Sequence, residues 1–325
     1  MATWSISAHN AFRRCQRQYY FQYIAANHNA KKDIWRRQAF IYKKLKNLKL
    51  WQGSLVDLGI QLYLIDALNN GETISHQKLI NQTIELSKQQ FNFSLTKSYW
   101  NRKNSSSDIG FCALYEHEYN QPITDDDLNH VFQTIELCYD NLFQISLPTN
   151  RHTLLIDLIK NASWKKANLQ NLNYPMDEIK VSPQIDLLMF TNNKPIVVDW
   201  KIAESDSSNY SRQLMICALP ILYKRNQYQP EDVIILEVNL LKNRIERYNL
   251  SKEKISEIED FIFQSYSDIQ MLVRNKSFYE QNIEDFDYAN SPTVCYYCNF
   301  RKLCRSFSNK EYSSCDNIEL IFSEF

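Results

Sequence analysis

Apolar residues recur at helical spacing through the first half of the chain. This periodicity predicts helices over residues 7–26, 33–50 and 55–68, and a mostly helical stretch over 75–150. The best-defined helix begins near Thr124, because three aspartates fall in its first turn and interact favourably with the helix dipole. The first half of the chain is therefore expected to be largely helical.

The pattern changes at about residue 174, where short apolar runs typical of strands begin. The expected elements are strands at 179–190 and 195–202, a helix at 208–225, strands at 232–240 and 244–250, and a helix at 251–274. A hairpin followed by a helix, two strands and a helix predicts an α/β fold. We expect a mixed central sheet flanked by helices, with a large helical N-terminal or inserted region.

Composition excludes several classes of function. The 325 residues include only four glycines, with no GxGxxG or P-loop pattern, so a glycine-rich phosphate-binding loop is excluded. No apolar run approaches the roughly 20 residues that cross a bilayer, and the opening segment lacks the apolar stretch of a secretory signal. We therefore expect an intracellular protein without membrane contact, whose eight cysteines are thiols or metal ligands in preference to disulfides.

Charge is distributed unevenly although the net charge is zero. Residues 1–50 carry eleven Lys or Arg against one acid, Asp33, which gives this stretch a local charge of +10. Such a block indicates contact with a polyanion, and the alternative is a solvated helix face. The residues that we expect to contact a nucleic-acid backbone are Arg13, Arg14, Arg17, Lys31, Lys32, Arg36 and Arg37.

Two aspartates flank a predicted hairpin turn. Positions 186 and 199 sum to 385, so the centre of the turn falls between Asn192 and Asn193. With a tight two-residue turn, Asp186 and Asp199 are direct cross-strand neighbours whose Cβ atoms lie about 5 Å apart. Lys201 follows Asp199 by two residues and so points to the same face. The opposite face is apolar and is expected to be core: Ile185, Leu187, Met189, Ile196, Val198 and Trp200.

Two carboxylates this close require a compensating positive charge. At an effective dielectric constant near 20, their repulsion at about 5 Å is roughly 3 kcal/mol. A divalent cation removes that cost, and an all-oxygen ligand set with open positions suits Mg²⁺ or Mn²⁺. Lys201 would then orient or activate an attacking water and stabilise charge on a phosphate. The alternative is a surface hairpin on which Asp and Lys simply pair.

The sequence of this hairpin resembles the PD-(D/E)XK nuclease superfamily, specifically its RecB-like branch. The segments PQIDLLMF, which begins at Pro183, and VVDWK, which ends at Lys201, carry the resemblance. It implies a restriction-endonuclease-like core. It also implies that Asp186, Asp199 and the backbone carbonyl of Trp200 bind Mg²⁺ or Mn²⁺, and that Lys201 is the catalytic lysine.

Two further positions can be compared with that branch. Gln213 matches the catalytic glutamine on the helix after the hairpin, but Cys217 stands where a tyrosine is usual. An early helix of the branch carries G-x-x-x-His, and here the stretch that begins at Gly53 ends in Asp57. Because Asp is also a hard oxygen ligand, the comparison implies Asp57 as a further metal ligand. The alternative for this residue is a solvent-facing Asp57. The alternative for the whole protein is a DNA-binding or scaffold protein that keeps the nuclease fold, and the cysteine cluster described in the next paragraph, but has weakened catalysis.

Three cysteines near the end of the chain have the spacing C-x2-C-x5-C: Cys295, Cys298 and Cys304. A tetrahedral site needs a fourth ligand, for which Cys315 is the nearby candidate and Cys15 the distant one. The segment SISAHNAFRRC, which ends at Cys15, resembles the opening helix of RecB-like nucleases with an iron–sulfur cluster, such as the AddB-type helicase–nucleases and the CRISPR-associated RecB-like exonucleases. The resemblance implies a [4Fe–4S] cluster held by Cys15, Cys295, Cys298 and Cys304. Thiolate ligation also allows zinc, and unliganded thiols are the third alternative.

The expected function is that of a metal-dependent DNA nuclease, an exonuclease acting on ends or single strands in repair, recombination or defence. A helicase or another repair or defence complex is the expected protein partner. A zinc-stabilised interaction module is a weaker alternative. The expected organisation is 1–52 for the cluster-ligand and basic helices, 53–173 for a helical region, 174–280 for the nuclease core and 281–325 for the cysteine segment.

Overall fold

The computed structural model describes residues 2–148, 150–204 and 210–307. The chain divides into two compact units, each built from separate stretches of sequence. The first, here called the sheet unit, comprises Met1–Thr3, Asn47–Asn92 and Asn120–Ile262. The second, here called the cysteine unit, comprises Trp4–Lys46, Phe93–Tyr119 and Phe263–Phe325. The division into four consecutive segments stays a prediction.

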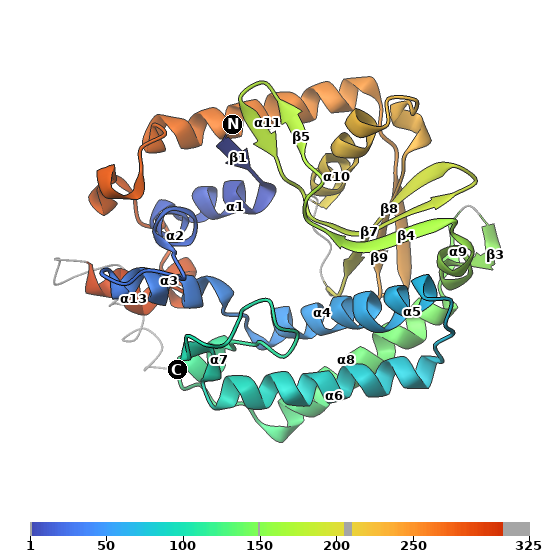
Figure 1. Cartoon of the computed structure of the whole chain (residues 1–325), viewed down its shortest axis with the longest axis horizontal. Coiled ribbons are helices and arrows are strands. Elements are labelled where there is room, and N and C mark those ends of the chain that lie inside the picture. Colours follow the sequence, from blue (N-terminus) through green and yellow to red (C-terminus); the bar gives the residue numbers. More distant parts are fainter. Residues whose placement is uncertain (1, 149, 205–209, 308–325) are drawn as a thin grey trace. The chain divides into compact units, whose positions relative to one another are not determined.

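A five-stranded mixed sheet is the centre of the sheet unit (Figure 1), with the strand order β10-β9-β8-β7-β4. These strands are β4 (Trp164–Leu169), β7 (Ile185–Thr191), β8 (Lys194–Lys201), β9 (Ile234–Asn239) and β10 (Arg244–Tyr248). Strands β8 and β9 are parallel and the other neighbours are antiparallel. Smaller sheets are formed by β1 (Ala2–Trp4), β6 (Ile179–Val181) and β5 (Tyr174–Met176), and by β2 (Ser146–Leu147) and β3 (Asn150–Leu154). The expected α/β fold is confirmed.

The β7–β8 hairpin has the predicted register. Leu187 pairs with Val198 and Thr191 with Lys194, so every pair of positions sums to 385. Asn192 and Asn193 form the turn with φ values of 50° and 60°. Two consecutive positive φ angles are those of a type I′ turn, which asparagine tolerates and which matches the twist of a hairpin.

Both faces of this hairpin are buried. The apolar face that the alternation predicts is buried along its whole length, and Leu188, Phe190 and Val197 on the aspartate face are buried as well. Helix α10 (Tyr210–Lys224) packs against β8 and β9. The aspartates therefore lie on a covered face of the sheet, and the alternative of a simple surface hairpin is rejected.

Helices α4 (Leu48–Gly59), α6 (His76–Leu95) and α8 (Asp125–Gln144) pack together within the sheet unit (Figure 1). Trp51 Nε1 on α4 donates to Gln90 Oε1 on α6 at 2.8 Å. Tyr139 on α8 donates its hydroxyl proton to the Val56 carbonyl on α4 at 3.1 Å, and its oxygen lies 3.0 Å from Thr83 Oγ1 on α6. These buried polar contacts fix α4, which carries Asp57.

The remaining elements complete the two units. Helical segments of the sheet unit are η2 (Ile60–Ile65), α5 (Asp66–Asn69), α9 (Leu155–Asn161), η4 (Pro230–Asp232) and the first half of α11 (Lys252–Val273). Those of the cysteine unit are α1 (Ile6–Arg14), α2 (Gln16–Tyr19), η1 (Tyr20–Ala25), α3 (Ile34–Lys44), η3 (Ser98–Trp100), α7 (Tyr115–Glu118), η5 (Phe278–Glu280), η6 (Ile283–Asp285), α12 (Pro292–Tyr296) and α13 (Arg301–Ser306). Within the described residues, no helix is long and apolar enough to cross a membrane.

Several predicted boundaries were wrong. The helix expected at 33–50 is interrupted at 45–47, because Lys46 pairs with Leu114 and Asn47 caps the next helix by accepting from the Leu50 amide. The helix expected at 7–26 is interrupted at Cys15, whose backbone is extended at φ −166°. Strand β4 begins at Trp164, ahead of residue 174. The sequence did not predict it, because its two lysines hide the apolar alternation.

Candidate functional site

The hairpin brings Asp186, Asp199 and Lys201 together. The register continues from Leu187 and Val198 to place Asp186 opposite Asp199. Lys201 Nζ lies 2.5 Å from Asp199 Oδ2, and both side chains are largely buried. Asp186 Oδ2 accepts a hydrogen bond from the Trp200 backbone N–H at 3.0 Å. The three charged groups therefore share one face of the sheet, as the alternation predicted.

Burial and mutual repulsion both act on the ionisation of this cluster. Burial, together with the charges of Asp199 and Asp57, raises the pKa of Asp186 to about 8. Burial alone would lower the pKa of Lys201, but the carboxylates of Asp199 and Asp186 outweigh it and raise that pKa. The lysine is therefore an ammonium ion that offsets part of the carboxylate charge.

Asp57 lies near the hairpin although it is more than 120 residues away in sequence. It is half-buried on α4, and its charge contributes to the raised pKa of Asp186. A solvent-facing side chain would be screened by water and would have little such effect. Asp57 therefore interacts electrostatically with Asp186.

Helix α10 presents a second group of residues to the site. Lys201 Nζ lies 4.3 Å from the ring centroid of Tyr210, at the first residue of this helix. Cys217 is fully buried, its thiol donates to the Gln184 carbonyl, and burial raises its pKa with a further contribution from Asp199. Gln213 lies one helical turn before Cys217 and is half-buried, so it is on the same side of α10.

Glu237 is a neighbour of the site that the sequence did not reveal. It is the direct partner of Asp199 in the parallel β8–β9 register and is buried. Tyr248 donates its hydroxyl proton within this group, with its oxygen 3.0 Å from Glu237 Oε2 and 2.9 Å from Glu246 Oε2. Burial raises the pKa of Glu237, and the charges of Glu246 and Asp199 add to that effect. A single acid within the apolar run DVIILEVNL was the only available signal.

The donor set of the hairpin fits a hard divalent cation. Asp199 Oδ2 is a buried oxygen whose close neighbour is the Lys201 ammonium at 2.5 Å. Carboxylate oxygens are the ligands that Mg²⁺ and Mn²⁺ prefer. Across residues 2–148, 150–204 and 210–307, no three His, Cys, Asp or Glu side chains stand in an arrangement that could hold a metal ion. The carboxylates would therefore have to move closer together around an ion. The role of the Trp200 carbonyl stays a prediction.

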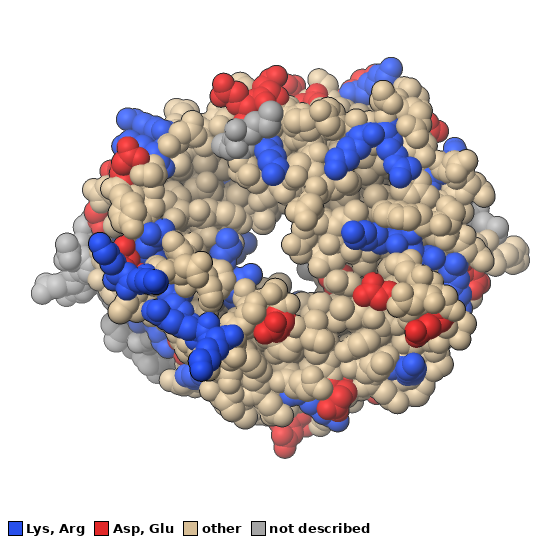
Figure 2. Space-filling view, in the orientation of Figure 1, with Lys and Arg blue, Asp and Glu red and all other residues tan. Residues whose placement is uncertain are grey.

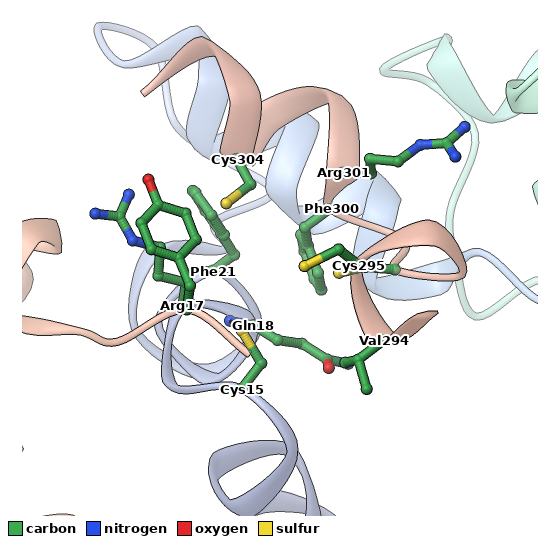
Figure 3. Close-up of a pocket in the computed structure, with 11 residues that line it drawn as sticks. Cys15, Arg17, Gln18, Phe21, Val294, Cys295, Phe300, Arg301 and Cys304 are labelled. Atoms are coloured by element: carbon green, nitrogen blue, oxygen red, sulfur yellow. Dashed lines mark hydrogen bonds between the residues drawn. The ribbon is translucent and has the colours of Figure 1, made fainter. Parts of the chain in front are cut away.

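The predicted cysteine ligands line one pocket of the cysteine unit. Cys15, Cys295, Cys298 and Cys304 surround it together with aromatic and basic residues, and Figure 3 shows the sulfur atoms of Cys15, Cys295 and Cys304 turned toward a common space. Cys15 is also the N-cap of α2, where its Sγ accepts from the Gln18 amide at 3.4 Å. None of the seven described cysteines forms a disulfide. Cys315 lies outside the described residues.

The walls of this pocket are apolar apart from its thiols. Phe21 and Phe300 stack with their ring centroids 5.7 Å apart and both line the pocket. Arg17 and Arg301 also belong to the lining, but their guanidinium groups donate to the carbonyls of Phe286 and Tyr296. Four thiols within apolar walls fit a thiolate-bound cluster of iron and sulfur.

The expected basic surface is only partly present. Arg17, Arg36 and Arg37 are buried, and their guanidinium groups donate to the carbonyls of Phe286, Ala25 and Trp100. These three arginines hold the cysteine unit together, so their predicted contact with a nucleic-acid backbone is wrong. Exposed members of the set are Arg13, Arg14, Lys31 and Lys32. Figure 2 shows Lys and Arg side chains gathered over α3 and α13.

Comparisons with known proteins assign the family. A sequence model of the PD-(D/E)XK nuclease superfamily matches residues 3–305. No curated protein matches the chain. A solved structure described as "Crystal structure of SSO0001" is 16% identical, with a TM-score of 0.30 and coverage of 70% of this chain and 98% of that chain, a likeness too low to carry an argument. The family match spans nearly the whole chain and includes every residue of the hairpin. This chain belongs to the PD-(D/E)XK nuclease superfamily.

Proposed function

We propose that this protein is a metal-dependent deoxyribonuclease that hydrolyses phosphodiester bonds at the β7–β8 hairpin. The observation that carries the proposal is the facing pair of Asp186, half-buried, and Asp199, buried, with Lys201 beside them on one sheet face. Family membership implies nuclease activity. Attack of water on a phosphodiester requires a bound cation and a positioned water. In this arrangement the carboxylates would hold the cation and the ammonium group would position the water.

Each residue of the cluster has a separate role in this proposal. Asp57, Asp186, Asp199 and the Trp200 carbonyl would hold Mg²⁺ or Mn²⁺, which when bound polarises the phosphodiester and lowers the pKa of coordinated water. Lys201 orients the attacking water and stabilises the charge that develops on the phosphate oxygens. Gln213, on the face of α10 that also carries Cys217, orients the substrate phosphate. The oxygen that leaves takes up a proton from solvent.

We further propose that the enzyme is an exonuclease of the RecB-like branch, acting on DNA ends or single strands in repair, recombination or defence. The spacing of Gln213 after the hairpin and the position of Asp57 on an early helix support this branch. Exposed Arg13, Arg14, Lys31 and Lys32 supply cations for a DNA backbone. A helicase or another repair or defence complex is the proposed partner, and an intracellular location remains a prediction.

The cysteine unit is proposed to hold a [4Fe–4S] cluster through Cys15, Cys295, Cys298 and Cys304. Four thiolates bound to a single zinc ion, each at about 2.3 Å, would lie within about 4 Å of one another. Within the described residues no three cysteines are arranged to hold a single ion in this way, so the thiols that line the pocket would have to move to bind one. The segment that ends at Cys15 resembles the opening helix of iron–sulfur RecB-like nucleases, which supports a cluster over zinc.

The test compares two lysines of the same strand. Purified protein with Mg²⁺ or Mn²⁺ should degrade end-labelled single- or double-stranded DNA, and Lys201→Ala should not. Lys194→Ala is the matched control, because Lys194 lies at the other end of β8 with its side chain 58% exposed. Equal activity of Lys201→Ala and wild type would refute the assignment. Substrates with blocked 5′ or 3′ ends distinguish exonuclease from endonuclease action.

A measurement of metal binding distinguishes the proposed nuclease from the scaffold alternative. It is favoured by the single observation that Asp57 stands where the branch has histidine. Calorimetry that shows no Mn²⁺ affinity alongside intact DNA binding would support a scaffold. Iron, sulfide and zinc analysis of anaerobically purified protein decides between a cluster and a zinc-stabilised module, and absorbance near 400 nm is expected for the cluster.

A further inference from the structure

A short aromatic and acidic segment in the middle of the chain contacts the cysteine segment near its end. The segment is Tyr115–Tyr119, which comprises α7 and the residue after it, and we name it the α7 clasp. It belongs to the same compact unit as the three C-terminal cysteines, although about 180 residues separate them in sequence. The sequence gives this acidic run no chemistry of its own.

Two phenol groups of the clasp bind the backbone on either side of Cys298. Tyr115 donates its hydroxyl proton to the Tyr296 carbonyl at 2.9 Å, and Tyr119 donates to the Asn299 carbonyl at 2.9 Å. Burial raises the pKa of Tyr115 to about 12 and also raises that of Tyr119, so both phenols stay protonated donors. Their rings stack on each other with centroids 4.4 Å apart.

The two basic residues between Cys298 and Cys304 contact the clasp as well. The guanidinium carbon of Arg301 lies 4.8 Å from the Tyr119 ring centroid. Lys302 Nζ donates to the Glu118 backbone carbonyl at 2.8 Å and lies 3.8 Å from Glu118 Oε1. Cation–π and charge-assisted contacts of this kind strengthen when they are withdrawn from water.

Glu118 anchors the clasp to the rest of the unit. Its side chain is buried, and Oε2 accepts hydrogen bonds from the Tyr99 hydroxyl and from Trp100 Nε1, both at 3.0 Å. The Tyr42 hydroxyl on α3 lies 3.4 Å from Oε1. A carboxylate with several donors resists displacement, because any movement leaves it buried and unsatisfied. The clasp is thus fixed on one side and holds the cysteine loop on the other.

We propose that the α7 clasp positions Cys298 and its neighbours and thereby determines how tightly the cysteine unit retains its metal group. This inference rests on the proposed cluster for its metal readout. The carbonyls of Tyr296 and Asn299 are held from outside, so the loop gives up less conformational freedom when its thiols bind. Residues that orient metal ligands from behind typically change metal affinity by about 10- to 100-fold.

The test removes two hydroxyl groups and keeps both rings. The double variant Tyr115→Phe/Tyr119→Phe loses the hydrogen bonds to the Tyr296 and Asn299 carbonyls but retains the aromatic stack. Tyr139→Phe is the matched control, since it removes a buried hydroxyl that also binds a backbone carbonyl, in the sheet unit. Far-UV circular dichroism on heating verifies that all three proteins fold.

The first readout is metal retention. Anaerobically purified wild type and Tyr139→Phe should lose absorbance near 400 nm slowly in the presence of a chelator, and the double variant about tenfold faster or more. Equal rates in wild type and double variant would overturn the clasp proposal. If the wild type contains no iron, sulfide or zinc, the proposed cluster is refuted. The clasp proposal is then tested by the second readout alone.

The second readout needs no metal. Alkylation of Cys298 by iodoacetamide in metal-free protein, followed by mass spectrometry, reports how firmly the loop is held. The double variant should react several-fold faster than wild type and Tyr139→Phe, whereas Cys15 should react alike in all three. Unchanged reactivity of Cys298 would show that the clasp does not position it.

Discussion

Gly59 is the last residue of α4, and the structure leaves no room there for a methyl group. A Cβ atom at this position would lie 1.9 Å from the Tyr139 hydroxyl oxygen and 2.4 Å from Thr83 Oγ1. Both oxygens belong to the buried hydrogen-bond group that joins α4, α6 and α8. We therefore expect Gly59→Ala to force Tyr139 and Thr83 apart and to destabilise the sheet unit.

The magnitude follows from opposing contributions. Alanine is favoured over glycine inside a helix by about 1 kcal/mol, because it loses less backbone freedom on folding. Insertion of a methyl group into a packed interior costs about 1–3 kcal/mol. Displacement of the Tyr139 hydroxyl from the Val56 carbonyl leaves buried polar groups unsatisfied, which costs a further 1–3 kcal/mol or so. The net loss in free energy of unfolding is expected to be about 3 kcal/mol, within a range of about 1–5 kcal/mol.

Gly53 provides a control in the same helix. No atom lies within 4 Å of a Cβ built there, so Gly53→Ala meets open space. This variant should be unchanged or stabilised by up to about 1 kcal/mol, measured like Gly59→Ala by urea denaturation with far-UV circular dichroism. Comparison of the two variants isolates the steric effect from helix propensity.

A double variant tests the named contact. Tyr139→Phe removes the oxygen that lies 1.9 Å from the new methyl group, so Gly59→Ala should cost less in that background by about 1 kcal/mol or more. A Gly59→Ala protein as stable as wild type would refute the steric argument. A loss in stability of the same size with and without the Tyr139 hydroxyl would show that the cause lies elsewhere.

Three further predictions concern the site and the cysteine unit. Asp57→Asn should lower nuclease activity with Mg²⁺ by about tenfold or more, because the amide lacks the ligand charge, and unchanged activity would remove Asp57 from the site. Mn²⁺ at about 100 times its Kd should stabilise the wild type by about 2.7 kcal/mol, seen as a higher thermal midpoint, and Asp186→Asn should abolish that shift. Burial, together with the nearby Lys97, lowers the pKa of His117 in the folded state. As the pH falls below about 6.5, the ordinary pKa of histidine, the unfolded chain therefore binds more protons than the folded chain. The free energy of unfolding should therefore fall from pH 7 to pH 5 more in wild type than in His117→Asn, and equal pH dependence in urea titrations would contradict this.

The hairpin was predictable from sequence because its determinants are local. Strict alternation assigns Asp186, Asp199 and Lys201 to one face, and a two-residue asparagine turn fixes the register. Strands β7, β8 and β9 were likewise evident as apolar runs. Strand β4 was missed, because Lys165 and Lys166 are adjacent and interrupt the apolar alternation, and Trp164 is 43% exposed.

Charge in the first fifty residues shows the opposite case. A lysine or arginine in a sequence has the same formal charge whether it faces solvent or a carbonyl oxygen. Only the fold shows that Arg36 donates to the Ala25 carbonyl and lies 3.7 Å from the Phe278 ring. Three of the seven basic residues expected to contact a polyanion are thereby committed to internal structure, since Arg17 and Arg37 are buried like Arg36.

The sequence alone determined which residues are candidates: an acidic pair and a lysine on one strand face, and three cysteines with a ligand-like spacing. The tertiary structure decided which distant residues join them. Glu237 lies beside Asp199 because β8 and β9, which a helix separates in sequence, pair as parallel neighbours in the sheet. The α7 clasp contacts the backbone next to Cys298 although about 180 residues separate the two segments in sequence. Periodicity reports only which face of an element a residue occupies. Which faces meet is determined by the packing of the whole chain, so the sequence did not show that these residues would become partners.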